Sequence, residues 1–148
     1  MSQQFDNYLF FDRTCAEAMR FYEKTLGGKI EMMMMTHADM PAAPGAPPLP
    51  AGSADLVMHC RLVVDGRILM ASDWLSDQAY PGMHGFAISL SYPDVAKANA
   101  VFAALAQGGS TTMPMAKTFW VEAFGMAVDR FGTPWMVNGG KPASMPGA

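Results

Sequence analysis

The sequence predicts an α+β fold in which one βαβββ unit occurs twice, with cupped mixed sheets around a cavity. Each half of the chain has a candidate strand, a helix that ends in Gly-Gly, and three further strands. A shift of 81 residues (from 21 to 102) carries Phe21 and Gly27-Gly28 onto identical residues. A shift of 66 residues (from 66 to 132) does the same for Gly66 and Met70. Functional side chains are therefore expected on the inward faces of both halves.

Length and composition indicate one globular domain. The chain has 148 residues, of which 51% are hydrophobic and 16% charged, so it can bury a sizeable core and does not have the composition of a disordered chain. We expect one domain over residues 1–139, with module one at about 5–73 and module two at about 84–139. Residues 140–148 are expected to form a frayed tail, because they are polar and contain Pro and Gly.

Charge and hydropathy patterns exclude several classes of partner. The net charge is −3 and no run of Lys or Arg occurs, which argues against a nucleic-acid partner. The apolar stretches have the length of strands, so no membrane span is expected. The first residues lack the basic and apolar regions of a signal peptide. Two cysteines, Cys15 and Cys60, do not make a disulfide framework, and we expect a reduced, cytoplasmic protein.

In the first half, aromatic and apolar residues predict a strand over Phe5–Phe11. Thr14 followed by Glu17 has the spacing of a capping box, so a helix is expected to begin there. Gly27-Gly28 is expected to end this helix, because glycine adopts the left-handed conformation common after a helix C-terminus. A strand over Lys29–Met35 follows.

The next segment, 37–54, contains five prolines and cannot pair inside a sheet. It is either a mobile lid or a disordered loop, and the sequence leaves both open. Strands over Leu56–Val64 and Arg67–Ser72 flank Asp65-Gly66, a dipeptide typical of two-residue hairpins.

The second half repeats this pattern after a connection over 74–83. Pro93-Asp94 is expected to open the second helix, and Arg130-Phe131-Gly132 to join the last two strands. The predicted elements are a strand over His84–Tyr92, a helix over Val95–Ala106, and strands over Ser110–Met115, Phe119–Asp129 and Thr133–Asn138.

Methionine is abundant, with 15 residues including the run Met32–Met35. Its flexible, polarisable side chain fills irregular cores and also adapts to varied apolar ligands. Core filling, a ligand-binding wall and a dimer seam all remain open for these residues.

Several motifs together resemble the PhnB-like branch of the vicinal-oxygen-chelate superfamily, which includes glyoxalase I, bleomycin-resistance proteins, fosfomycin-resistance enzymes and extradiol dioxygenases. The resemblance runs from about residue 5 to 139, and it implies two βαβββ modules and a homodimer. The motifs are Tyr8-Leu9-Phe10-Phe11-Asp12, Phe21-Tyr22, Leu26-Gly27-Gly28, Leu69-Met70-Ala71-Ser72-Asp73, Thr118-Phe119-Trp120, Phe124-Gly125-Met126, Asp129-Arg130-Phe131-Gly132 and Trp135-Met136-Val137-Asn138.

The resemblance also implies positions for a divalent metal. Enzymes of the superfamily hold it with His, Glu or Gln on the first and last strands of each module. The corresponding positions here are Asn7, Met70 or Ser72, a position near Phe86, and Met136 or Asn138. None is a histidine or a carboxylate, and thioether or phenyl groups do not suit catalytic zinc, nickel, iron or manganese. We therefore predict no metal and no other cofactor.

The residues at these six positions are candidates for lining a ligand pocket, and four further residues join them. His59 and Arg61 alternate with apolar residues, so one face of their strand is polar. His59 either orients a substrate or acts as a base, or it is an ordinary hydrogen-bonded strand histidine. Trp120 and Glu122 are either a pocket wall with one polar anchor or a core tryptophan beside a surface glutamate. A displaced metal site at His59 with Glu122 or His84 also remains open.

Two functions fit these residues. The first is a metal-free protein that binds an unidentified small molecule in an apolar cavity lined by Met and aromatic side chains. The second is a metal-dependent lyase, isomerase or dioxygenase-type enzyme of the same superfamily. Methyl transfer is not supported, because no glycine-rich loop follows a first strand in a βαβ unit. No catalytic residue can be assigned from the sequence.

Overall fold

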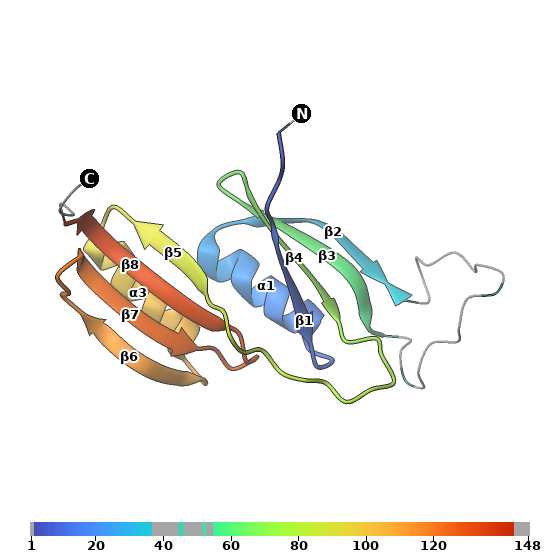
Figure 1. Ribbon diagram of the computed structural model, residues 1–148. Helices are drawn as coiled ribbons and strands as arrows, with labels where there is room; N and C mark the ends of the chain where they lie inside the picture. The colour runs from blue at the N-terminus through green and yellow to red at the C-terminus, as the bar shows by residue number, and fades with distance from the viewer. Residues whose placement is uncertain (1, 37–44, 46–51, 53–54, 144–148) are drawn as a thin grey trace. The chain divides into compact units, whose positions relative to one another are not determined.

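The chain folds into two compact units, Met1–Gly82 and Met83–Ala148. This is seen in a computed structural model that describes residues 2–36, 45, 52 and 55–143 (Figure 1). The boundary falls inside the predicted connection between the modules. Most of the predicted proline-rich loop and the end of the predicted tail lie outside the described residues.

Unit 1 is a four-stranded mixed sheet with one helix. The strands stand in the order β1-β4-β3-β2; β1 runs parallel to β4, and the other neighbours are antiparallel. The elements are β1 Asn7–Phe11, α1 Cys15–Leu26, β2 Lys29–Met35, β3 Val57–Val64 and β4 Arg67–Asp73.

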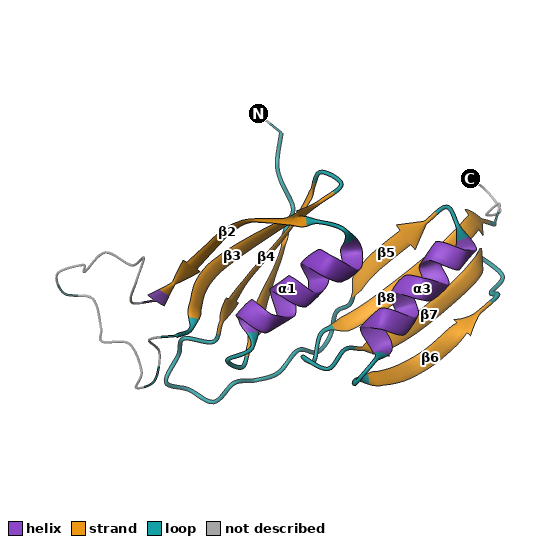
Figure 2. Ribbon diagram, turned by 180° about the vertical axis from the view of Figure 1, so that it is seen from behind, coloured by secondary structure: helices purple, strands orange, loops and turns teal. Residues whose placement is uncertain are grey.

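Unit 2 has the same topology, with the strand order β5-β8-β7-β6 and a parallel β5·β8 pair. The elements are β5 Ile88–Tyr92, α3 Val95–Ala106, β6 Ser110–Ala116, β7 Val121–Val128 and β8 Pro134–Pro142. Figure 2 shows that each helix lies across one face of its own sheet. The predicted duplication of a βαβββ unit is confirmed.

The core of each unit lies between the helix and the sheet. In unit 1 the fully buried Met19 and Tyr22 come from α1, and Cys60 and Leu62 come from β3. Because side chains alternate across a strand, the intervening residues lie on the sheet face that turns away from the helix. We call this side the open face of each unit. Within the described residues, neither helix is long and apolar enough to cross a membrane.

Two predicted strand ends differ from the structure. The strand predicted from His84 begins only at Ile88, so Phe86 precedes it. The last strand extends to Pro142, so residues 140–142 of the predicted tail belong to β8, where Val121 pairs with Pro142. The predicted hairpin at 65–66 is confirmed, because Asp65 and Gly66 both have positive φ angles (48° and 76°), as a type I′ turn requires.

The predicted capping box of α1 is wrong. Thr14 is the N-cap residue, but its side chain makes no cap hydrogen bond. Instead Asp73, at the end of β4, accepts hydrogen bonds from the backbone N–H groups of Cys15 (2.9 Å) and Val57 (2.8 Å). The second helix does use a local cap, since Asp94 accepts from the Ala96 N–H at 2.9 Å.

The two Gly-Gly pairs have matching structural roles. The first glycine of each pair has a left-handed φ angle, +74° at Gly27 and +79° at Gly108. The second approaches a strand backbone so closely that a Cβ on Gly28 would lie 2.6 Å from the Val63 carbonyl oxygen. A Cβ on Gly109 would overlap the Val128 carbonyl oxygen. The left-handed φ angle therefore explains the first glycine of each pair, and close contact with the sheet explains the second.

Both cysteines are expected to be unreactive in the folded protein. Burial raises the pKa of the Cys15 thiol far above its usual value, and the charges of Asp73 and Cys60 add to this. Burial also raises the pKa of Cys60 from 9.0 to about 11, partly opposed by Arg20. A two-unit shift lowers the thiolate fraction roughly 100-fold at mildly alkaline pH. Alkylation of the cysteines, followed by mass spectrometry, should therefore be slower in the folded protein than in the protein unfolded in guanidinium chloride, by at least this factor. Equal rates in the two states would contradict the burial of both thiols.

Candidate functional site

The open face of unit 1 carries two rows of side chains that run across the sheet. Leu9 and Phe11 of β1 are buried toward α1, so Tyr8 and Phe10 lie on the open face. The strand register then defines the rows. The first contains Tyr8, Met70, Arg61 and Met32, and the second contains Phe10, Ser72, His59 and Met34.

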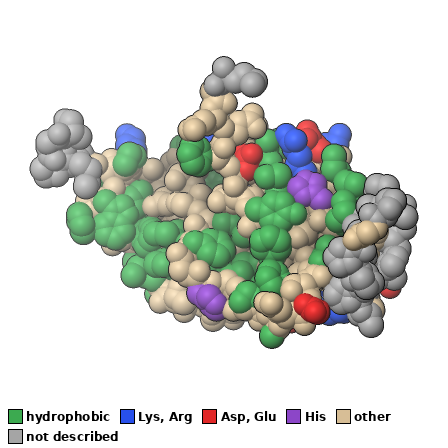
Figure 3. Space-filling view, turned by 45° about the vertical axis from the view of Figure 1, so that its right-hand side comes forward, with side chains coloured by type: hydrophobic (Ala, Val, Ile, Leu, Met, Phe, Trp, Pro, Cys, Tyr) green, Lys and Arg blue, Asp and Glu red, His purple; other side chains and the backbone are tan. Residues whose placement is uncertain are grey.

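Each strand contributes a different kind of side chain to these rows. The outer strand β1 contributes aromatic rings, and Tyr8 and Phe10 have ring centroids 5.1 Å apart. The other outer strand, β2, contributes methionines. The polar residues His59 and Arg61 stand between them on β3. In Figure 3 a histidine side chain (purple, upper right) borders hydrophobic and basic side chains.

A tyrosine–histidine pair spans the middle of this face. The Tyr8 hydroxyl and the Nδ1 atom of His59 are 3.2 Å apart and share a hydrogen bond, and their ring centroids are 5.7 Å apart. The two residues are 51 positions apart in the sequence, and β4 lies between their strands. The pair joins the aromatic edge to the polar centre of the open face.

Arg61 is held by one acidic neighbour. Its Nε atom lies 3.3 Å from Oε2 of Glu31, and the two side chains are 41% and 50% exposed. The Nε–H has no hydrogen bond of good geometry within the described residues, so the contact is an ion pair without directed bonding. At this exposure, water and salt screen the pair, and it contributes little to stability.

An aromatic segment after β4 extends the β1 edge. The rings of Phe10 and Trp74 meet edge to face at 5.7 Å and 87°. Tyr80 packs against Trp74, and its hydroxyl donates to the Phe10 carbonyl oxygen at 2.7 Å. Burial, and then the charge of Asp12, raise the pKa of Tyr80, so the hydroxyl stays a donor. The predicted connection between the modules is therefore anchored to unit 1.

The open face of unit 2 is less polar. One row consists of Ser89, Met136, Met126 and Met113, so three methionines stand side by side on β8, β7 and β6. The next row begins with Ser91, Asn138 and Phe124. The Asn138 amide donates to the Leu90 carbonyl oxygen at 3.1 Å and contacts the Ser89 hydroxyl at 3.3 Å. Asn138 therefore connects β8 to β5.

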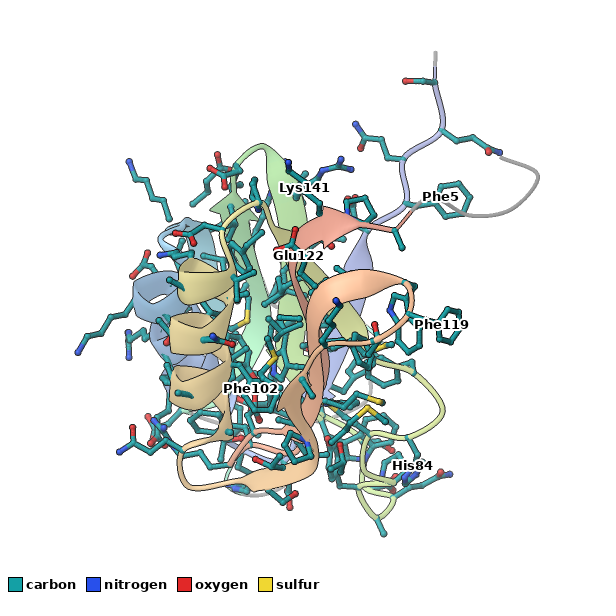
Figure 4. The ribbon with its side chains drawn as sticks, turned by 90° about the vertical axis from the view of Figure 1, so that its left-hand side faces the viewer. Phe5, His84, Phe102, Phe119, Glu122 and Lys141 are labelled. Atoms are coloured by element: carbon teal, nitrogen blue, oxygen red, sulfur yellow. The ribbon has the colours of Figure 1, made fainter. Side chains whose placement is uncertain are left out.

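Trp120 and Glu122 do not form the predicted strand pair. Trp120 precedes β7, and its ring packs edge to face on Phe124 at 5.2 Å. The 81% exposed Phe119 also packs edge to face with Trp120, at 4.8 Å. Glu122 lies at a register shift of β7 and accepts a hydrogen bond from the Lys141 backbone at 3.1 Å. Figure 4 shows Glu122 close to Lys141, and Phe119 apart from them and projecting outward. Glu122 thus stabilises the β7·β8 pairing.

The candidate metal positions are distributed over different faces. Met70 and Met136 do lie on the open faces, as expected for equivalent positions. Asn7 pairs with the buried Leu69 and falls on the helix-facing side of β1, so Tyr8 is the residue opposite Met70. Phe86 precedes β5, and Ser89 is the residue opposite Met136. The alternation of Leu9 and Phe11 was the sequence signal that could have identified Tyr8.

The donors at these positions do not fit a divalent metal. The first and last strands of the two units present Tyr8 with Met70 and Ser89 with Met136 on the open faces. A neutral phenol, two thioethers and a hydroxyl lack the imidazole and carboxylate groups that such metals prefer. Among the residues that the structure describes, no group of three His, Cys, Asp or Glu side chains is arranged to hold a metal ion.

Comparison with known proteins assigns the class. The chain belongs to the Glyoxalase/Bleomycin resistance protein/Dioxygenase superfamily, whose family model matches residues 4–137. Among curated proteins, it is 30% identical over 136 residues to Protein YjdN of Escherichia coli (strain K12), covering 88% of this chain and 91% of YjdN.

Two solved structures show the same fold over nearly the whole chain. The crystal structure of protein PA1353 from Pseudomonas aeruginosa is 44% identical, with a TM-score of 0.83, and the match covers 94% of this chain and 98% of that one. The PhnB protein from Bacillus cereus is 20% identical, with a TM-score of 0.75, over 93% and 99% of the two chains. The PhnB-like resemblance predicted from the sequence is thereby confirmed.

Proposed function

We propose that this protein binds a small, mainly apolar molecule without a metal, at the open face of a sheet. The observation that carries the proposal is the pairing of Tyr8 with Met70 and of Ser89 with Met136 on the open faces of the first and last strands of each unit, the strands on which the superfamily holds its metal. These residues supply apolar contact and hydrogen bonding but no ligand set for a dication.

The exposed side chains support a binding role. Phe10, Met32 and Met113 lie on the open faces and are 43–46% exposed, which leaves apolar area available for a ligand. Methionines adapt their shape to the molecule that they contact, and they line both faces. His59 and Arg61 add a few polar groups to an otherwise apolar surface, which is the usual composition of a small-molecule site.

The second candidate is an enzyme of the same superfamily: a lyase, isomerase or dioxygenase-type enzyme that uses a displaced metal, or that uses His59 as a base. The hydrogen bond between Tyr8 and His59 favours the variant in which His59 is the base, because it fixes the orientation of the imidazole. A bound metal that is lost on His59→Ala would support the metal-dependent form.

Binding of Nile red, a neutral apolar dye, tests the binding function. We expect saturable fluorescence enhancement, with affinity reduced roughly tenfold by Phe10→Ala, because about 1.5–3 kcal/mol accompanies full burial of such a side chain. Phe5→Ala is the matched control, since Phe5 is 92% exposed and precedes β1. The absence of saturable binding, or near-stoichiometric nickel, zinc, iron or manganese in the purified protein, would contradict the proposal.

We propose in addition that the protein pairs with a second copy and works in the cytoplasm. Pairing would cover part of the apolar surface that each chain exposes. The mass of the native particle in solution tests the first statement.

A further inference from the structure

We infer that the ligand is a planar aromatic carboxylate, and that Arg61 and His59 on the open face of unit 1 bind its carboxylate. This inference rests on the proposed binding function and specifies the chemical class of the ligand. Three features of the protein support it: the donors at the outer end of the Arg61 side chain, the position of His59, and the difference between the two units.

Arg61 has hydrogen-bond donors that no described residue uses. Its only charged contact within the described residues is Glu31, which lies against Nε. The four N–H groups at the outer end of the guanidinium have no hydrogen-bond partner among the residues that the structure describes. These groups form the planar fork that binds a carboxylate through two parallel hydrogen bonds, and Arg carries its charge at all accessible pH values.

His59 adds a second donor on the same side of the strand. It is two residues from Arg61, so the two side chains leave the open face about 7 Å apart. The Tyr8 hydroxyl occupies Nδ1, and when it donates to that atom the proton of the imidazole is on Nε2. His59 then offers one N–H to a ligand whose carboxylate contacts Arg61.

The two units show that these polar residues are not required by the fold. Arg61 pairs with Met70 on the closing strand of unit 1, and Met126 pairs with Met136 at the equivalent place in unit 2. Two residues earlier, Phe124 takes the place of His59. The same sheet topology therefore forms with Met and Phe at both positions. A binding role for Arg61 and His59 explains why unit 1 differs from unit 2 at these positions.

The surroundings select an anion with a flat apolar body. Within the two rows of the open face of unit 1, Arg61 is the only Arg, Lys, Asp or Glu residue, and its neighbour Glu31 contacts it at Nε. The outer N–H groups of the guanidinium therefore favour an anion over a cation. Tyr8 presents its ring beside His59, Phe10 packs against Tyr8, and Trp74 extends this aromatic edge. Aromatic rings pack favourably against a second flat ring in offset or edge-to-face geometry.

Calorimetry with 2-naphthoate and its neutral analogue 2-naphthamide tests this inference. The wild-type protein should bind the carboxylate at least about tenfold more tightly than the amide, because hydrogen bonds to charged groups are stronger than neutral ones. Arg61→Met, which introduces the residue found at the equivalent position of unit 2, should remove this preference. Glu31→Gln should strengthen naphthoate binding, because it removes the competing carboxylate.

The matched control is Arg67→Met, because Arg67 is exposed but belongs to the helix-facing side of β4. It should keep the wild-type preference. Nile red separates the two proposals. Suppose that Nile red binds, but that 2-naphthoate and 2-naphthamide bind equally well or do not bind at all. The inference of an aromatic carboxylate is then overturned, while the proposed binding function stands. If Nile red also fails to bind, both are contradicted.

Discussion

Replacement of Asp73 by asparagine should lower the free energy of unfolding by about 3 kcal/mol, the cost of leaving buried polar groups without partners. Asp73 is 2% exposed, and its two carboxylate oxygens accept hydrogen bonds from the N–H groups of Cys15 and Val57. Asparagine has one acceptor oxygen, and its NH₂ group would face a second N–H donor. The N–H group of Cys15 at the start of α1, or that of Val57 at the start of β3, would therefore lose its hydrogen-bond acceptor.

Urea denaturation followed by circular dichroism measures this change. Asp77→Asn is the control, because Asp77 is exposed in the same segment after β4, and it should change the stability by less than about 0.5 kcal/mol. Equal effects of the two substitutions would show that loss of negative charge, and not loss of the buried hydrogen bonds, is responsible.

Alanine at the second glycine of either Gly-Gly pair should be strongly destabilising, by about 3 kcal/mol or more, because it forces overlap with backbone atoms. At Gly28 the new Cβ would lie 2.5 Å from Val64 Cγ2 and 2.6 Å from the Val63 carbonyl oxygen. At Gly109 it would overlap the Val128 carbonyl and lie 2.9 Å from the Asp129 Cα atom. Neither strand backbone can move without breaking its ladder.

Gly27→Ala is the matched control for this effect. Gly27 has a φ angle of +74° but no heavy atom within 4 Å of an added Cβ, so only backbone strain of about 1 kcal/mol is expected. In thermal unfolding, the Gly109→Ala and Gly28→Ala variants should therefore have clearly lower melting temperatures than the Gly27→Ala variant. The reverse order would mean that conformational freedom, and not close packing against the strand, maintains the glycine pairs.

The turn after β7 was predicted in part from the sequence. Arg130-Phe131-Gly132 was expected to join the last two strands, and it does so in a turn where Asp129 accepts hydrogen bonds from the Phe131 and Thr133 N–H groups. Turn chemistry of this kind acts over a few residues and is visible in a sequence. The further bond from the fully buried Trp135 indole to the same carboxylate, at 2.8 Å, required the folded strand.

The sequence by itself determined the duplicated βαβββ topology, both Gly-Gly helix ends and the hairpin at Asp65-Gly66, because each depends on backbone conformation and local hydrophobic pattern. Only the tertiary structure decided which candidates share a face. It placed Tyr8, not Asn7, opposite Met70, and brought Tyr8 into contact with His59. It also tied Glu122 to the Lys141 backbone. Strand register causes these differences, since a slip of one residue moves every side chain to the other face of the sheet.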